Sequence, residues 1–143
     1  MDELKARALR YLVRREHSRD ELARKLAPHA ASKEILEGTL NWLESTSKLS
    51  NQRFAEIRAH VLARKYGAAR IRQDLKSKGV SEEIAERAVA EVDDVAKAKE
   101  ILARKYRVPA TSREERAKRA RFLHSRGFAF DTIYQVIRIG DDE

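Results

Sequence analysis

The chain has 143 residues, of which 38% are charged and 6% aromatic, and its formal net charge is +8. It contains no cysteine, which excludes disulfides and thiolate metal sites. No stretch approaches the roughly 18 apolar residues that a membrane span needs, and the first residues carry no apolar signal region, so we expect a soluble cytoplasmic protein without membrane contact.

Three helices are predicted in the first third of the chain. Apolar residues at helical spacing between residues 3 and 16 predict the first. Ser18 and Glu21 form a capping-box pattern that opens the second helix, and Pro28 ends it because proline disfavours helix in the preceding residue. Ser32 is expected to cap the third helix. The residues predicted to face inward there are Ile35, Leu36, Leu40 and Leu43.

A short polar linker, residues 45–51, leads into a second group of three helices. The second helix of this group is expected to bury Ile71 and Leu75, and Ser81 is expected to cap the third helix. The inward face of the first helix is predicted to be Phe54, Ile57, Val61 and Leu62. That of the last helix is predicted to be Ile84, Ala88, Val89 and Val92.

The remaining residues predict a third group of three helices. Its first helix runs through Ala98 and Ile101 until Pro109 breaks it. Ser112 and Glu115 form another capping-box pattern at the start of the next helix. The inward residues of that helix are predicted to be Ala117, Ala120 and Leu123, and the last helix contains Ile133, Tyr134, Val136 and Ile137.

Four glycines lie at or within the predicted helices. Gly67 is expected to end a helix as a left-handed cap, Gly79 ends the next one, and Gly127 precedes the last helix. Gly38 lies inside a predicted helix, where glycine costs about 1 kcal/mol relative to alanine. The pattern offers no reason for that glycine.

The three-helix pattern occurs three times along the sequence. Residues 26–35 align without a gap to residues 75–84, and residues 102–106 repeat residues 62–66 letter for letter. A period in the forties is typical of tandem helical repeats, in which each unit is too thin to bury a large core alone. We therefore expect neighbouring units to share apolar surface.

The predicted fold is all-α, an elongated array of three tandem three-helix repeats with about nine helices. The repeats are placed at residues 1–49, 50–93 and 94–143. No long heptad pattern is present, which argues against a coiled-coil dimer, so we expect a monomer.

Basic residues gather in the second and third repeats, whereas acidic residues gather between residues 82 and 94 and in the last three positions. Such patches attract polyanions, although a solvated basic face is the alternative. Repetition of the patch in two units favours binding. The candidate partner- and DNA-binding residues are Arg64, Lys65, Arg70, Arg72, Lys76, Lys78, Arg113, Arg116, Arg119, Arg121 and Arg126.

The aromatic residues leave two interpretations open. Tyr66 and Tyr106 each follow an Arg-Lys pair, so they could stack on nucleic-acid bases or simply cover the core of a unit. Trp42 lies one position off an apolar stripe, so it could pack between helices or anchor a protein partner.

No pattern in the sequence indicates catalysis. There is no Gly-rich phosphate loop, and the four histidines do not pair at metal-ligand spacing. His17 is interpreted as a helix-end residue, and the serines as helix caps. We expect no enzyme activity, no metal site and no cofactor.

Several segments together resemble the RecX family of regulators of the RecA recombinase. They are residues 9–18 with Glu21-Leu22, Arg53-Phe54-Ala55, residues 67–79, and residues 126–130 with Ile133 and Arg138. The resemblance spans about residues 4–138 and implies an all-helical protein that lies in the groove of the RecA filament on single-stranded DNA. It implies an inhibitor of RecA ATPase and strand exchange in recombination and DNA repair.

This chain departs from the family pattern at Ser50-Asn51-Gln52, where relatives usually carry acids. Two further interpretations stay open. One is a helical DNA-binding protein that acts on single- or double-stranded DNA without RecA, because three-helix units with a basic middle helix resemble helix-turn-helix geometry. The other is a helical adaptor without nucleic-acid contact, which the uneven charge disfavours.

Overall fold

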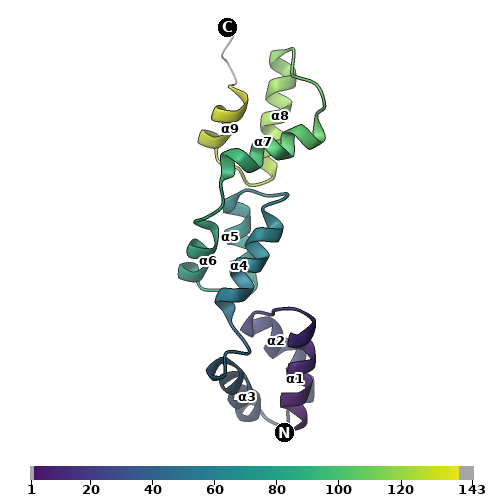
Figure 1. The fold of residues 1–143 in the computed structure, drawn as a ribbon, viewed down its shortest axis with the longest axis vertical. Coiled ribbons are helices and arrows are strands. Elements are labelled where there is room, and N and C mark those ends of the chain that lie inside the picture. The colour runs from purple at the N-terminus through teal and green to yellow at the C-terminus, as the bar shows by residue number, and fades with distance from the viewer. Residues whose placement is uncertain (1, 139–143) are drawn as a thin grey trace.

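The computed structural model describes residues 2–138, which form nine α-helices, one short 3₁₀ helix and no strand. The elements are α1 (Glu3–Arg14), α2 (Arg19–Leu26), η1 (Ala27–His29), α3 (Lys33–Ser45), α4 (Asn51–Leu62), α5 (Ala68–Ser77), α6 (Glu82–Val89), α7 (Asp94–Lys105), α8 (Arg113–Ser125) and α9 (Phe130–Ile137). The helices form three trios stacked end to end along one axis (Figure 1). The prediction of an elongated all-α array is confirmed.

Short polar side chains begin most of these helices. Residues whose side-chain oxygen accepts a backbone N–H of the first turn are Asp2, Ser18, Ser32, Ser50, Ser81, Asp93 and Ser112. Ser18 and Glu21 form the complete predicted capping box. The second predicted box is only half present, because the Glu115 carboxylate accepts from the N–H and hydroxyl of Thr111 instead of reaching the cap backbone.

Each trio buries its own apolar cluster. The first centres on Leu22 and Leu43, the second on Ile71 and Leu75, and the third on Phe128, all of them at most 1% exposed. Every pair of helices in substantial contact belongs to the same trio. The expectation that neighbouring units share apolar surface is therefore wrong: the three cores are separate.

Three apolar residues that were predicted to face inward are on the surface. Ile57 and Val61 on α4 are 54% and 53% exposed, and Ile35 on α3 is 50% exposed. The buried face of α4 consists of Phe54 together with the small residues Ala55 and Ala59. The small side chains of Ala55 and Ala59 let α4 pack closely on α6, and Ile57 and Val61 turn outward.

His17 is buried in the loop between α1 and α2, with 1% of its surface exposed, although it was interpreted as a helix-end residue. Its Nδ1 lies 3.1 Å from the carbonyl oxygen of Arg15 and its Nε2 lies 2.8 Å from Nζ of Lys25. A carbonyl only accepts and an ammonium only donates, so Nδ1–H donates and Nε2 accepts. The contacts therefore fit a neutral imidazole, and burial lowers its pKa below 6.5.

The lowered pKa of His17 makes the stability of the first trio depend on pH. Below pH 6.5 His17 becomes protonated in the unfolded chain but stays neutral in the folded chain. The free energy of unfolding therefore falls as the pH drops from 6.5 toward the folded-state pKa of His17. Urea unfolding at pH 7.5 and 5.5 should show this loss. The loss should shrink in His17→Gln and persist in His60→Gln, whose side chain is exposed. An equal loss in His17→Gln would contradict the assignment.

Gly38 lies in the middle of α3 on its exposed side, and a methyl group built there would meet no atom within 4 Å. Alanine should therefore stabilise the first trio by about 0.5–1 kcal/mol, because glycine loses more backbone entropy on folding. The free energy of unfolding in urea measures this gain. A neutral or destabilising Gly38→Ala would mean that the glycine has a role which the free space around it does not reveal.

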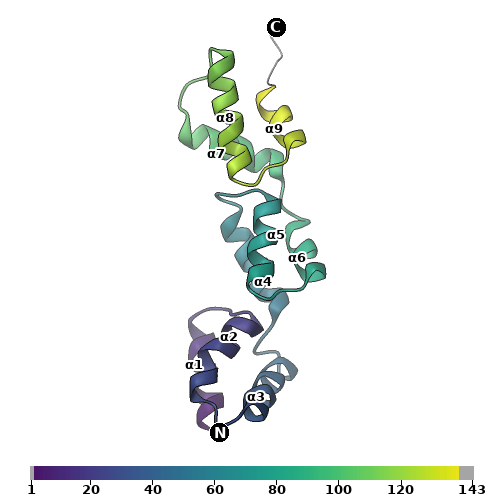
Figure 2. The ribbon, with the colours of Figure 1, turned by 180° about the vertical axis from the view of Figure 1, so that it is seen from behind.

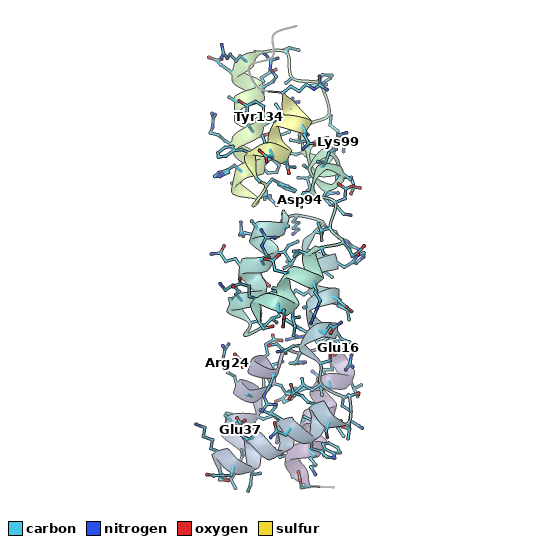
Figure 3. The ribbon with its side chains drawn as sticks, turned by 90° about the vertical axis from the view of Figure 1, so that its left-hand side faces the viewer. Glu16, Arg24, Glu37, Asp94, Lys99 and Tyr134 are labelled. Atoms are coloured by element: carbon cyan, nitrogen blue, oxygen red, sulfur yellow. The ribbon has the colours of Figure 1, made fainter. Side chains whose placement is uncertain are left out.

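The junction between the first and second trios is polar. Asn51 Oδ1 accepts the backbone N–H of Arg19 at 2.8 Å, and Arg53 Nε donates to Glu16 Oε2 at 2.9 Å. Glu16 lies at this junction in Figure 3, and Asp94 lies at the next one. The Ser50-Asn51-Gln52 segment thus supplies a helix cap and an inter-trio hydrogen bond.

The second and third trios meet backbone to backbone. The N–H of Gly67 donates to the carbonyl oxygen of Arg126 at 2.8 Å, and the N–H of Ala68 donates to Asp94 Oδ1 at 3.1 Å. The loop that contains Gly67 lies against the end of α8 in both views (Figures 1 and 2). A methyl group on Gly67 would come within 2.5 Å of the Gly127 carbonyl oxygen. Glycine is required at position 67 by this close contact between backbones and not by a left-handed backbone conformation.

That contact corrects the predicted role of Gly67. Its φ is −81°, so it is not a left-handed cap, and it stands at the N-terminus of α5. Gly79 and Gly127 do adopt positive φ, at 83° and 92°. Among the glycines of residues 2–138, these two supply the left-handed conformation that ends a helix.

Candidate nucleic-acid interface

Cationic and aromatic side chains alternate across the junction of the second and third trios. Cζ of Arg70 lies 4.5 Å from the centroid of the Tyr66 ring, and Cζ of Arg126 lies 5.6 Å from the same centroid. Arg126 also lies over the Phe122 ring at 4.9 Å. Each distance is within the range of a cation–π interaction.

The alternation continues along the third trio. Lys105 Nζ lies 4.9 Å from the Phe122 centroid and 5.7 Å from that of Tyr106, and Arg119 covers Tyr106 at 4.3 Å. We call this set the cation–aromatic row. Its members are Arg70, Tyr66, Arg126, Phe122, Lys105, Tyr106 and Arg119.

Helix geometry accounts for three of the seven members of the row. Arg119, Phe122 and Arg126 stand at positions i, i+3 and i+7 of the α8 segment, so they lie on one face of it. Tyr106 directly follows α7, and its ring meets that of Phe122 edge-on at 6.1 Å. The row is therefore built from one face of α8 together with the end of α7 and the start of α5.

Backbone carbonyl groups orient the basic side chains at this junction. Arg70 Nη1 donates to the carbonyl oxygen of Ser125 at 3.0 Å, and Arg126 Nη1 donates to that of Lys65 at 3.4 Å. Arg104 donates to the carbonyl oxygen of Arg64. Each of these bonds uses one of the five N–H donors of a guanidinium, which leaves the others for a ligand.

The cations of the row are not neutralised by ion pairs in the described part of the chain. None of the ion pairs formed between residues 2 and 138 involves Arg70, Lys105, Arg119 or Arg126. Glu115, one turn before Arg119, is engaged by Thr111. Uncompensated cations held in fixed positions attract anions most strongly.

Two arginines outside the row behave differently. Arg19 holds Glu44 at 2.6 Å and Glu37 at 2.9 Å, and Arg58 pairs with Asp74 through two oxygens at 2.5 and 3.0 Å. The carboxylate of Asp74 raises the pKa of Arg58. Arg19 and Arg58 are thus neutralised within the fold. The row is the candidate for contact with a polyanion because its unpaired cations are grouped on shared rings at one junction.

The structure does not bring all eleven candidate residues together. Arg70, Arg119 and Arg126 belong to the row, and exposed Arg64 and Lys65 lie in the loop between Tyr66 and α4.

The other candidates lie elsewhere. Arg72 and Lys76 line a groove with Glu82 and Glu86, and Arg72 pairs with Glu86 at 3.5 Å. The remaining ones are Lys78 at the end of α5, exposed Arg113 and Arg121 on α8, and half-buried Arg116.

Phe122 was missing from the candidates drawn from the sequence, and Lys105 was noted only as part of the Arg-Lys pair before Tyr106. Phe122 could have been found from its spacing between Arg119 and Arg126 on one helix face. Both tyrosines carry cations on their rings, and half-buried Tyr66 also packs against the second core. Their faces are thus occupied by cations, which disfavours base stacking.

Trp42 is half-buried and packs against the first core. Lys5 and Lys48 place their ammonium groups 4.5 and 5.4 Å from its ring centroid. This environment favours the packing interpretation over that of an exposed anchor.

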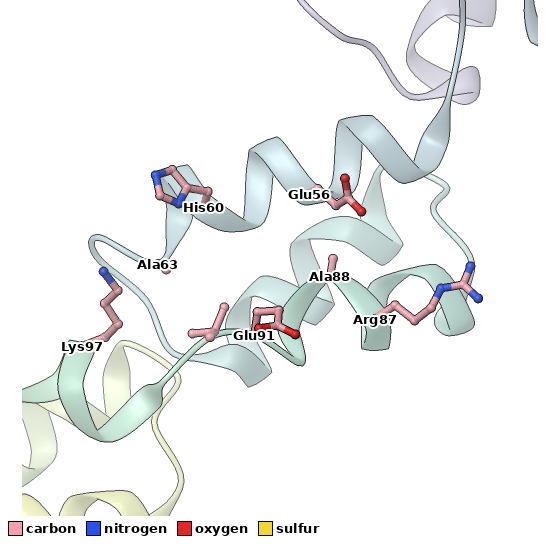
Figure 4. A pocket seen from close by; sticks show the side chains of 8 residues that line it. Glu56, His60, Ala63, Arg87, Ala88, Glu91 and Lys97 are labelled. Atoms are coloured by element: carbon pink, nitrogen blue, oxygen red, sulfur yellow. The ribbon is translucent and has the colours of Figure 1, made fainter. Parts of the chain in front are cut away.

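A groove of about 290 Å³ runs between α4 and α6. Figure 4 shows Glu56 and Glu91 together with His60, Arg87 and Lys97 around it. The mixed charges do not select for one ligand class. Within residues 2–138 no cluster of three or more potential metal ligands occurs, and no helix there has the length and apolarity to cross a bilayer.

Three family models match this chain in tandem. They describe the first, second and third three-helix domains of RecX, and they match residues 5–43, 50–89 and 91–137. The chain belongs to the RecX family. The family resemblance of the sequence is thereby confirmed.

Members of the RecX family resemble the chain over almost its whole length. The regulatory protein RecX of Ralstonia nicotianae is 44% identical over 140 residues, which cover 96% of this chain and 88% of the relative. That of Neisseria meningitidis serogroup C is 38% identical and covers 98% and 92%. The crystal structure of RecX from Lactobacillus salivarius matches with a TM-score of 0.82 and 25% identity over 95% and 93% of the two chains.

Proposed function

We propose that this chain is an inhibitor of the RecA recombinase that lies in the groove of the RecA filament on single-stranded DNA. The observation that carries the proposal is the cation–aromatic row, a set of uncompensated cations on an elongated RecX fold. Cations of this kind bind the phosphates of DNA, and binding through phosphates does not depend on the base sequence.

The shape of the molecule suits a polymeric partner. Three trios stacked along one axis can contact more than one protomer of a filament, whereas a compact protein of this size would reach fewer (Figure 2). Bridging neighbouring protomers in one conformation would slow the cycle in which they hydrolyse ATP. Inhibition by this route is steric and electrostatic, and it needs no catalytic residue in the inhibitor.

The test is the DNA-dependent ATPase activity of RecA, measured with and without this protein on a single-stranded template. We expect the rate to fall as the protein is added, and we expect the effect to weaken as salt rises because phosphate contacts release counterions. An unchanged ATPase rate and unchanged strand exchange would refute the proposal. Tight, sequence-dependent binding of duplex DNA without RecA would favour a free-standing DNA-binding protein instead.

A further inference from the structure

The cation–aromatic row is divided between two trios. Tyr66 and Arg70 belong to the second trio, whereas Arg126 and the rest of the row belong to the third. The Tyr66 ring receives one guanidinium from each side of the junction, Arg70 at 4.5 Å and Arg126 at 5.6 Å. The row is therefore continuous only while the two trios are docked.

Docking depends on two glycines that let the backbones touch. A methyl group on Gly67 would approach the Gly127 carbonyl oxygen to 2.5 Å and a ring carbon of Phe128 to 2.9 Å. A methyl group on Gly127 would collide with Cβ of Arg70. The helices of the two trios share no extensive interface, so this close approach sets the position of Arg126 relative to Tyr66.

We infer that the junction of the second and third trios is a composite phosphate-binding site for the backbone of single-stranded DNA, and that Tyr66 is its positioning residue. The inference rests on the proposed function for the choice of DNA as the ligand. Cations cover the ring faces, so the ligand meets the free N–H edges of the guanidiniums and not the rings. The cations of the row follow one another in a single series of ring contacts, which suits the one phosphate backbone of single-stranded DNA.

Two consequences follow for binding. A change that separates the trios should weaken DNA binding as much as the loss of an arginine, although every charge is still present. Loss of the Tyr66 ring should have the same effect, because Arg70 and Arg126 would lose the ring on which both guanidiniums lie.

The experiment measures binding of a fluorescein-labelled oligothymidylate to the full chain by anisotropy over a series of salt concentrations. Gly67→Ala should lower the affinity at least tenfold and reduce the salt dependence by about 0.7 for each phosphate that the site no longer neutralises. Gly38→Ala is the matched control, because its methyl group meets nothing within 4 Å, and it should bind like the wild type. Wild-type affinity in Gly67→Ala would overturn the composite site.

Circular dichroism checks whether Gly67→Ala keeps its helical content. A second pair of variants tests the site independently, in case Gly67→Ala misfolds. Tyr66→Phe keeps the ring and should keep both the affinity and the salt dependence. Tyr66→Leu keeps an apolar side chain against the second core but removes the ring, and it should bind at least tenfold more weakly. Equal binding by the two variants would show that Tyr66 does not position the arginines.

These assays contain no RecA, so the two proposals can fail separately. Wild-type oligonucleotide binding in Tyr66→Leu together with inhibition of RecA would overturn the composite site and leave the proposed function standing. Loss of binding in both Gly67→Ala and Tyr66→Leu would support the site whatever the RecA assay shows.

Discussion

Reversing the charge of Arg70 and Arg126 together should raise the concentration needed for half-inhibition of RecA ATPase by at least tenfold. Each arginine lies on the Tyr66 ring without a carboxylate partner among residues 2–138. A hydrogen bond to a charged group contributes about 1.5–3 kcal/mol, and about 1.4 kcal/mol corresponds to a factor of ten in affinity. Titration of the inhibitor into a RecA ATPase assay gives the shift.

The control for this pair reverses the same number of charges in the first trio. Arg14 and Arg24 are exposed and form none of the ion pairs of the described residues, and Figure 3 labels Arg24 on α2. Arg14→Glu with Arg24→Glu should change half-inhibition much less. Similar losses in the two double variants would mean that only the total charge matters, and the row would lose its assignment.

Replacing Phe128 with alanine should unfold the third trio while the first stays folded. Phe128 is 1% exposed and is the largest side chain of the third core. Loss of a buried phenylalanine costs about 3–5 kcal/mol, which is most of the stability of so small a unit. Hydrogen exchange should show amides of α7–α9 losing protection, with those of α1–α3 unchanged.

Phe130 provides a matched comparison two residues further on. Its side chain is 65% exposed and stacks on His124 with ring centroids 4.9 Å apart. Phe130→Ala should change stability by about 0.5 kcal/mol or less, as surface substitutions usually do. If Phe128→Ala exposed the amides of all three trios equally, the chain would unfold as one cooperative unit, which would contradict the independence of the cores.

Much of the local structure could be predicted from the sequence. Ser18, Ser32, Ser81 and Ser112 all cap helices as predicted, because capping depends on a hydroxyl and on amides within three residues of it. The number of helices in the described residues also follows from periodicity and breakers. The repeat boundaries at residues 49/50 and 93/94 stay a prediction.

One failure concerns which face of a helix is buried. Ile57 and Val61 were assigned to the core from their helical spacing with Phe54, whereas α4 buries Ala55 and Ala59 beside Phe54. Apolar residues lie on both sides of this helix, so periodicity alone cannot choose between them. The choice depends on how closely α6 packs against α4.

The family, the helices and the excess of positive charge could all be established from the amino-acid sequence. Those properties depend on residue types and on spacings within one or two helical turns. Which cations act together is a property of the folded chain, because Arg70 and Arg126 are brought onto one ring by a contact between two glycines. Gly67 and Gly127 are 60 residues apart in the chain, and no local pattern connects them.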